Sequence, residues 1–307
     1  MRSHLSRFAL ATGFALTEHG RNRFAMVLVV LFVPLWTTLA YLAMPETPAP
    51  MQLHATGERL SPRGNELTEI SGALNAVTLI TGFMMFAATF SGSLFDRRLA
   101  MAGYPRVHLV LAKVTALALI SAAVAAYATA ITCLAWTPRQ PFLLAAALFT
   151  AGLTYGALGV GFGSVLRREV EGMFAIVMTS IIDLALQNPI TSSGADTPIM
   201  RYLPSYGAMQ ASTAAGFSSN PVPRHLVIQL TWFAGAALIA LMAFRRGTRS
   251  TLPAAALTPV AGRGSGNAGL PVPRQETAPM RAEPQLTPVV PHAASPAQQG
   301  RAAGPEH

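Results

Sequence analysis

The segment from Gln140 to Leu166 reads QPFLLAAALFTAGLTYGALGVGFGSVL, which is 27 residues without a charged side chain. A helix rises 1.5 Å per residue, so about 20 apolar residues are enough to cross the roughly 30 Å of hydrocarbon in a bilayer. Only 11% of the 307 residues are charged, and 51% are hydrophobic. An average globular protein carries about 25% charged residues. The composition therefore predicts a polytopic membrane protein and argues against a soluble enzyme.

Three further segments are long enough to cross a membrane. Uncharged runs of 22, 26 and 25 residues cover Phe24 to Pro45, Ile70 to Phe95 and Val114 to Pro138. With two apolar segments in the second half of the chain, they predict an all-α fold of six transmembrane helices, at about 24–44, 70–94, 110–136, 142–166, 172–192 and 225–244. The fifth is the weakest, because it contains Asp183 and ends near Asn188-Pro189, and a residue before proline is disfavoured in a helix.

A further uncharged stretch lies between the last two spans and contains several prolines. Unpaired backbone groups cost several kcal/mol each in hydrocarbon, so this stretch is a poor lipid-facing span. We expect a short, re-entrant helix at 206–217 on the outer face of the protein.

Arginine and lysine are distributed unequally among the expected connections. Thirteen lie in the N-terminal segment, between spans two and three, between spans four and five, and after span six, whereas five lie in the other connections. Because cytoplasmic loops are enriched in positive charge, both termini are expected in the cytoplasm, with the spans in the cell membrane. This placement accounts for the net charge of +9 without nucleic acid as a partner.

The two ends of the chain differ from the six-span domain, residues 24–247. Residues 1–23 place several apolar side chains on one side of a helical wheel and basic ones on the other. This pattern favours an amphipathic helix at the membrane interface over a leader whose charges only fix the topology. Residues 248–307 are rich in proline, alanine and glycine. Such a composition buries too little apolar surface to offset ordering entropy, so a disordered cytoplasmic tail is expected.

The sequence lacks the residues that common catalytic sites require. The only lysine, Lys113, follows Ala112 in an apolar run, so the chain has no P-loop and no ATPase site of its own. The seven histidines are scattered and Cys133 is the single cysteine, which predicts neither a metal site nor a disulfide. A serine protease pair of Ser164 and His225 would be separated by the bilayer in the predicted topology. We expect no catalytic residue and no cofactor on this chain.

The connection between spans two and three reads SGSLFDRRLAMAGYPR, from Ser91 to Arg106. An acidic-basic turn is followed by Tyr-Pro-Arg and then by the next apolar helix. Arg21-Asn22-Arg23 precedes span one, a large loop separates the first two spans, and Tyr202-Leu-Pro-Ser-Tyr206 precedes the last. In this order, over about residues 2–247, these features resemble the permease subunits of type-two ABC exporters.

The resemblance implies an exporter of a drug, lipid or glycan. Two copies of the permease, identical or related, would form the path as a dimer, and separate cytoplasmic ATPase subunits would hold the ATP and magnesium. The ATPase would contact the N-terminal helix and the turn that contains Asp96, Arg97, Arg98, Tyr104, Pro105 and Arg106. Many members have a glutamate-glycine pair where this chain has Phe95-Asp96-Arg97-Arg98. The arginines are also needed to orient the protein, so a partner contact and a purely topological role are both open for each.

Asp183 is expected about 17 Å from the cytoplasmic end of span five, near the middle of the bilayer. Gln187 follows four residues later and shares its helical face. The pair either lies on the substrate path or bonds a neighbouring helix. A proton-coupled secondary transporter that uses Asp183 is the alternative function, although no inverted repeat is visible between the halves of the chain.

Span four has two GxxxG spacings, formed by Gly152, Gly156, Gly159 and Gly163. Small residues at this interval let two helix backbones approach closely. We expect packing against other helices of the same chain, and a contact between two permease copies is the alternative interpretation.

Overall fold

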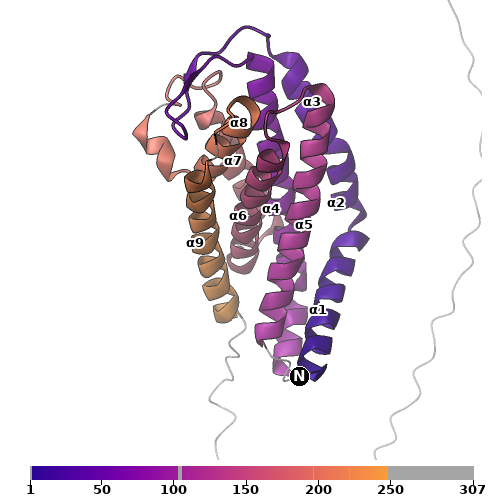
Figure 1. The fold of residues 1–307 in the computed structure, drawn as a ribbon. Helices are drawn as coiled ribbons and strands as arrows, with labels where there is room; N and C mark the ends of the chain where they lie inside the picture. Colours follow the sequence, from indigo (N-terminus) through magenta and orange to yellow (C-terminus); the bar gives the residue numbers. More distant parts are fainter. Residues whose placement is uncertain (1, 103–105, 196, 221, 248–307) are drawn as a thin grey trace, which may run out of the picture. The chain divides into compact units, whose positions relative to one another are not determined.

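The structure is a computed structural model that describes residues 2–102, 106–195, 197–220 and 222–247 (Figure 1). The helices are α1 (Arg2–Arg21), α2 (Arg23–Val27), the π-helical turn η1 (Leu28–Phe32), α3 (Val33–Ala43), α4 (Gly64–Met101), α5 (Arg106–Ala135), α6 (Pro141–Val165), α7 (Glu169–Gln187), the 3-10 helix η2 (Pro198–Tyr202), α8 (Tyr206–Phe217) and α9 (Pro223–Gly247). The loop between α3 and α4 forms a small antiparallel hairpin of β1 (Met51–Gln52) and β2 (Arg59–Leu60). The expected tail, residues 248–307, lies outside the described residues.

Five helices of the described chain are long and apolar enough to cross a bilayer, namely Ala25–Ala43, Gly64–Gly92, Val107–Ala135, Pro141–Val165 and Pro223–Arg246. The prediction of a helical membrane protein is therefore confirmed. The helix expected as the fifth of six crossings is present as α7, but it is not one of these five. It has only 19 residues and carries Glu169, Glu171 and Asp183. Charged groups are costly in hydrocarbon, so a crossing by α7 stays a prediction.

Helix α6 occupies the centre of the bundle and packs against α4, α5 and α9. Its glycines permit this packing. A Cβ atom on Gly159 would overlap the carbonyl oxygen of Gly82 in α4, and Gly163 also abuts the α4 backbone. Gly152 and Gly156 face α5, where a Cβ atom would meet the side chains of Ser121 and Leu117. All four glycines therefore lie at contacts within this chain. A larger residue would overlap the α4 backbone at Gly159 and Gly163, and would displace side chains at Gly152 and Gly156.

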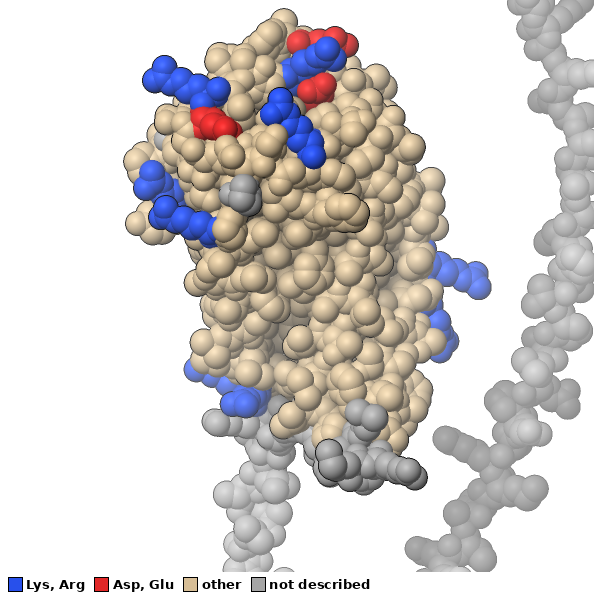
Figure 2. Space-filling model, in the orientation of Figure 1, with Lys and Arg blue, Asp and Glu red and all other residues tan. Residues whose placement is uncertain are grey.

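The described helices have two different ends. In Figure 1 the start of α1 and the end of α9 lie at one end, and α8 lies at the other. On the face shown in Figure 2, charged side chains gather toward both ends, and a few project about midway along the flank formed by α1 and α2. The rest of the middle of this face is uncharged, as a bilayer-spanning surface requires.

The predicted N-terminal helix is present as α1 and packs against α5. Figure 1 shows it running alongside the bundle instead of crossing beneath it. Leu10 and Phe14 are 58% and 65% exposed, so α1 presents an apolar surface away from the bundle. His19 is buried on the other side, and its burial and the nearby Lys113 lower its pKa to about 4. The contact of α1 with the membrane surface stays a prediction.

Candidate functional site

Helix α8 and the residues before it are buried inside the protein although they are rich in polar groups. Residues 205–216 are all buried, and α8 packs against α4, α6 and α9. The short helix expected at 206–217 is therefore present with the predicted bounds. Its surroundings explain how a polar segment is tolerated there, because buried backbone and side-chain groups find partners on the neighbouring helices.

Asp183 of α7 is at the centre of one set of these contacts and is 2% exposed. The Tyr155 hydroxyl donates to Oδ2 of Asp183 at 2.5 Å, and the Ser205 backbone N–H donates to the same oxygen at 2.9 Å. Nε2 of Gln187 donates to Oδ1 at 2.6 Å and to Oγ of Ser205 at 2.8 Å. Ser205 directly precedes α8, where the helix dipole favours a negative charge. The Asp183 carboxyl therefore links α6, α7 and the start of α8.

Gln229 makes a second set of contacts beside the first. Its Nε2 donates to Oγ1 of Thr154 at 2.8 Å and to the carbonyl oxygen of Pro204 at 2.9 Å. Its Oε1 accepts from the backbone N–H of Ala208 at 3.0 Å. Both sets converge on residues 204–208, so α6, α7 and α9 together fix the start of α8.

A crevice of about 200 Å³ opens between α3, α4 and α7. Asn75 of α4 lies on its wall and is 6% exposed; its Nδ2 donates to Oγ of Ser180 at 3.0 Å. Its Oδ1 and Oγ1 of Thr68 have no hydrogen-bond partner among the described residues. Trp36, Ser71 and Leu184 also line the crevice. Oδ1 of Asn75 and Oγ1 of Thr68 are themselves buried, so they are polar positions within the wall and are not open to the crevice.

The crevice is smaller than a complete ligand pocket, which typically measures about 300–1,000 Å³. The two helices at its edges also expose large apolar side chains. These are Leu35, Leu39 and Leu42 of α3 and Phe174, Ile182 and Leu186 of α7. The crevice is therefore an open, mainly apolar half-site between two apolar surfaces, with a few polar residues such as Ser71 and Asn75 in its wall.

The structure brings Asp183 and Gln187 together, as their spacing predicts. Both side chains, however, are bonded to Tyr155 or Ser205. Among the described residues that line the crevice, neither Asp183 nor Gln187 is present. Their contacts are those of a structural link between helices.

Glu69 is a buried acid that the sequence analysis missed. It is 1% exposed, and Nε1 of Trp136 donates to its Oε2 at 2.8 Å. The Trp136 ring stacks on Phe217 of α8, with the centroids 5.3 Å apart. The second span was predicted to begin at residue 70, whereas α4 begins at Gly64 and includes Glu69. Polar residues recur every three or four positions, at 68, 71, 75 and 78, and this helical spacing could have been used to predict an earlier start for the helix.

The residues expected to contact an ATPase lie where α4 and α5 meet their connection. Asp96, Arg97 and Arg98 belong to the final turns of α4, and Arg98 is exposed. Arg106 begins α5, while Tyr104 and Pro105 lie outside the described residues. Helix α4 continues six residues past the uncharged run that ends at Phe95, which extends it by about 9 Å.

No family model matches this chain, and no curated protein matches it. The described residues contain no group of three His, Cys, Asp or Glu side chains placed to hold a metal ion.

Proposed function

We propose that this chain is the membrane-spanning permease subunit of a type-two ABC exporter. It would form half of a path for a drug, lipid or glycan, and a separate cytoplasmic subunit would bind ATP and magnesium and carry out hydrolysis. The observation that carries the proposal is the half-sized crevice between the exposed apolar faces of α3 and α7. A second permease copy against these faces would replace lipid there and enclose the crevice as part of a path.

The proposed topology has six crossings in the cell membrane, with both termini in the cytoplasm. Helix α7 is then the fifth crossing. Its first two acids, Glu169 and Glu171, are exposed in its first turn and would lie in the water layer. Its third, Asp183, is hydrogen-bonded to three groups inside the protein, which offsets the cost of placing it at membrane depth.

Helix α4 would connect the ATPase to the crevice. Its extension beyond Phe95 contains the proposed contact at Asp96, Arg97 and Arg98, and Asn75 of the same helix lies on the crevice wall. Close packing against α6 makes the helix rigid, so a displacement at one end is passed along it. ATP binding would thus bias the crevice between inward and outward openings.

Charge reversal at the end of α4 tests this connection. The double variant Arg97→Glu/Arg98→Glu should insert normally but lose the ATP hydrolysis that the purified complex of permease and ATPase shows in a bilayer. Arg167→Glu/Arg168→Glu is the matched control, because these exposed arginines follow α6 on the same predicted side. Unchanged hydrolysis in the first variant, or an equal loss in both, would contradict the coupling role.

A proton-coupled transporter is the second candidate, and the two buried acids Asp183 and Glu69 are the observation in its favour. Transport into vesicles distinguishes the two functions. The exporter requires ATP on the cytoplasmic side and works without a pH gradient, whereas the proton-coupled protein works as a single chain and stops when the gradient is collapsed.

A further inference from the structure

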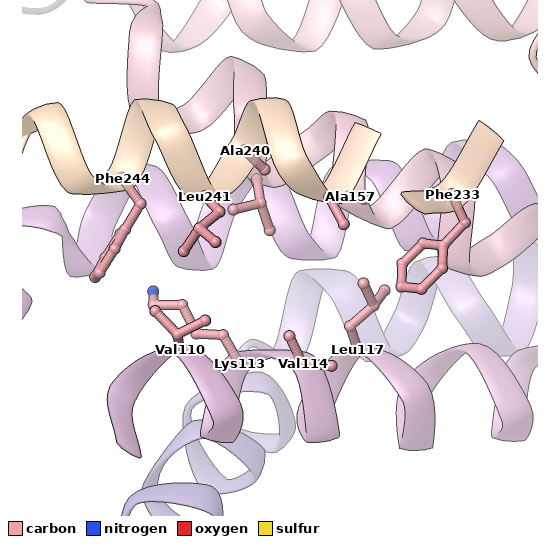
Figure 3. Close-up of a pocket in the computed structure, with 11 residues that line it drawn as sticks. Val110, Lys113, Val114, Leu117, Ala157, Phe233, Ala240, Leu241 and Phe244 are labelled. Carbon is pink, nitrogen blue, oxygen red and sulfur yellow. The ribbon is translucent and has the colours of Figure 1, made fainter. Parts of the chain in front are cut away.

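Helices α5 and α9 both pack on α6 but hardly touch each other along their described residues. A groove remains between them, and Figure 3 shows its side chains pointing toward one another from the two helices. Leu117 of α5 and Phe233, Ala240 and Phe244 of α9 are among its walls, and Ala157 of α6 contributes to its floor. Val160 of α6 also lies at the floor, and the wall on α9 includes the small residue Ala237.

The length of the groove matches one leaflet of a bilayer. From Phe233 to Phe244 the wall on α9 spans eleven residues, or about 16 Å of helix, against about 30 Å for the whole hydrocarbon layer. Its lining is apolar except at one end, where Lys113 enters from α5. An acyl chain is an apolar ligand of the right shape for such a groove.

Positive charge is concentrated at this one end. The Lys113 ammonium lies 5.8 Å from the centroid of the Phe244 ring, and Arg245 and Arg246 follow in the last turn of α9. The field of Lys113 also reaches α1, because it contributes to the low pKa of His19. Basic groups between transmembrane helices at the membrane surface are a recognised environment for anionic lipid head groups.

We propose that the groove between α5 and α9 binds one anionic bilayer phospholipid, with an acyl chain along Leu117 and Phe233 and the phosphate beside Lys113 and Arg245. A zwitterionic lipid would fill the same apolar space but would gain less from the cationic end. The site is separate from the crevice and its binding does not depend on an ATPase. Only its assignment to the cytoplasmic leaflet rests on the proposed topology.

Native mass spectrometry of the purified full chain, titrated with phosphatidylglycerol or phosphatidylcholine in detergent, tests the site. The wild type should retain one phosphatidylglycerol in preference to phosphatidylcholine. Lys113→Ala should weaken phosphatidylglycerol binding about five-fold and weaken phosphatidylcholine binding less, since one cation near a membrane surface contributes about 1 kcal/mol to the binding of an anionic lipid. Lys113→Arg should restore the preference. Arg167→Ala, which removes an exposed arginine outside the groove, should have no effect.

A second variant tests the apolar part of the groove. Ala237 is half-buried on the α9 wall, so Ala237→Phe should fill the groove and weaken the binding of both lipids. Equal retention of the two lipids by the wild type would overturn the proposal, as would an unchanged preference in Lys113→Ala. If Ala237→Phe reduces the oligomeric state without changing lipid binding, a second copy of the chain occupies the groove and the proposal is wrong. None of these results depends on whether the chain has an ATPase partner.

Discussion

Replacing Asp183 tests whether its carboxyl has a structural role or carries protons. Alanine at this position removes the acceptor for the Tyr155 hydroxyl and for the Ser205 backbone N–H. Gln187 retains the Ser205 hydroxyl as a partner. The Tyr155 hydroxyl retains the carbonyl oxygen of Thr179, 3.4 Å away, as an acceptor, whereas the buried Ser205 N–H is left without one. A buried donor left without an acceptor costs about 1–3 kcal/mol, so Asp183→Ala should lower stability by at least this amount, out of the about 5–15 kcal/mol that a typical domain has to lose.

Asp183→Asn should be milder, because the network can adapt to an amide. The amide oxygen can take the place of Oδ2 and accept from Tyr155 and Ser205. The new nitrogen then faces Gln187, whose Oε1 has no partner among the described residues. Rotation of the Gln187 amide by 180° turns this oxygen toward the new donor, and the Ser205 hydroxyl can donate to the rotated side chain. The loss should be about 1 kcal/mol, which is the net value of one hydrogen bond.

Thermal unfolding of the two variants in detergent, followed by size-exclusion chromatography, measures the difference directly. For a proton-coupled transporter, Asp183→Asn would remove the titratable group and stop transport in a protein that still folds. For the proposed exporter it should leave ATP-driven transport close to wild type. If Asp183→Asn is as unstable as Asp183→Ala, the adaptable network described above is wrong.

Three further changes test individual contacts. Gly159→Ala should destabilise the protein by about 1–3 kcal/mol in thermal unfolding, because the new methyl group overlaps the α4 backbone. Gly161→Ala is the control and should be neutral or stabilising, because the nearest atom to its new methyl group is 4.0 Å away. Burial of His19 disfavours its protonation, so the docking of α1 should be most stable above the usual histidine pKa of 6.5 and should weaken as the pH falls toward 4. About 2 kcal/mol should be lost at pH 5. Hydrogen exchange in α1 should show this loss, and His19→Gln should remove the pH dependence. Trp136→Phe should keep the aromatic stack on Phe217 but leave the carboxyl of Glu69 without its N–H donor, which should lower the free energy of unfolding by about 1–3 kcal/mol. In a double-mutant cycle, adding Glu69→Gln should recover most of this loss.

The membrane-spanning helices were predictable because hydrocarbon imposes one simple requirement, a long uncharged run. The segment 142–166 was expected, and α6 covers 141–165. Helix ends were harder. Helix α4 begins six residues before the predicted span and continues to Met101, because it is buried by protein at one end and leaves the apolar zone at the other. An uncharged-run criterion detects contact with lipid and misses helix that is covered by protein.

The partners of buried polar groups were not predictable in the same way. The spacing of Asp183 and Gln187 indicates a shared face, and the two side chains do bond each other. Nothing in the local sequence indicates that Tyr155 and Ser205, 28 and 22 residues away, complete the network. These contacts depend on how α6 and α8 are arranged in three dimensions, and a single sequence carries little information on that arrangement.

The strength of each helix contact limits how the proposed path can open. Helix α4 is held to α6 by backbone packing at Gly82 and Gly159, and such an interface cannot slide without overlap. Its contact with α7 includes Ser180, which bonds Asn75 at 3.0 Å and Thr78 at 2.7 Å. These two hydrogen bonds and the Tyr155–Asp183 bond between α6 and α7, at about 1 kcal/mol each, can be broken at a cost comparable to the few kcal/mol that separate alternating protein states. In the proposed cycle α4 and α6 therefore move as one body, and the crevice widens where Ser180 separates from α4. Ser180→Ala should consequently shift the equilibrium between the two states toward the one with the wider crevice. Distance measurements between spin labels on α4 and α7 can detect this shift. If the distance distribution is identical to that of the wild type, the contact that opens is not the one between α4 and α7.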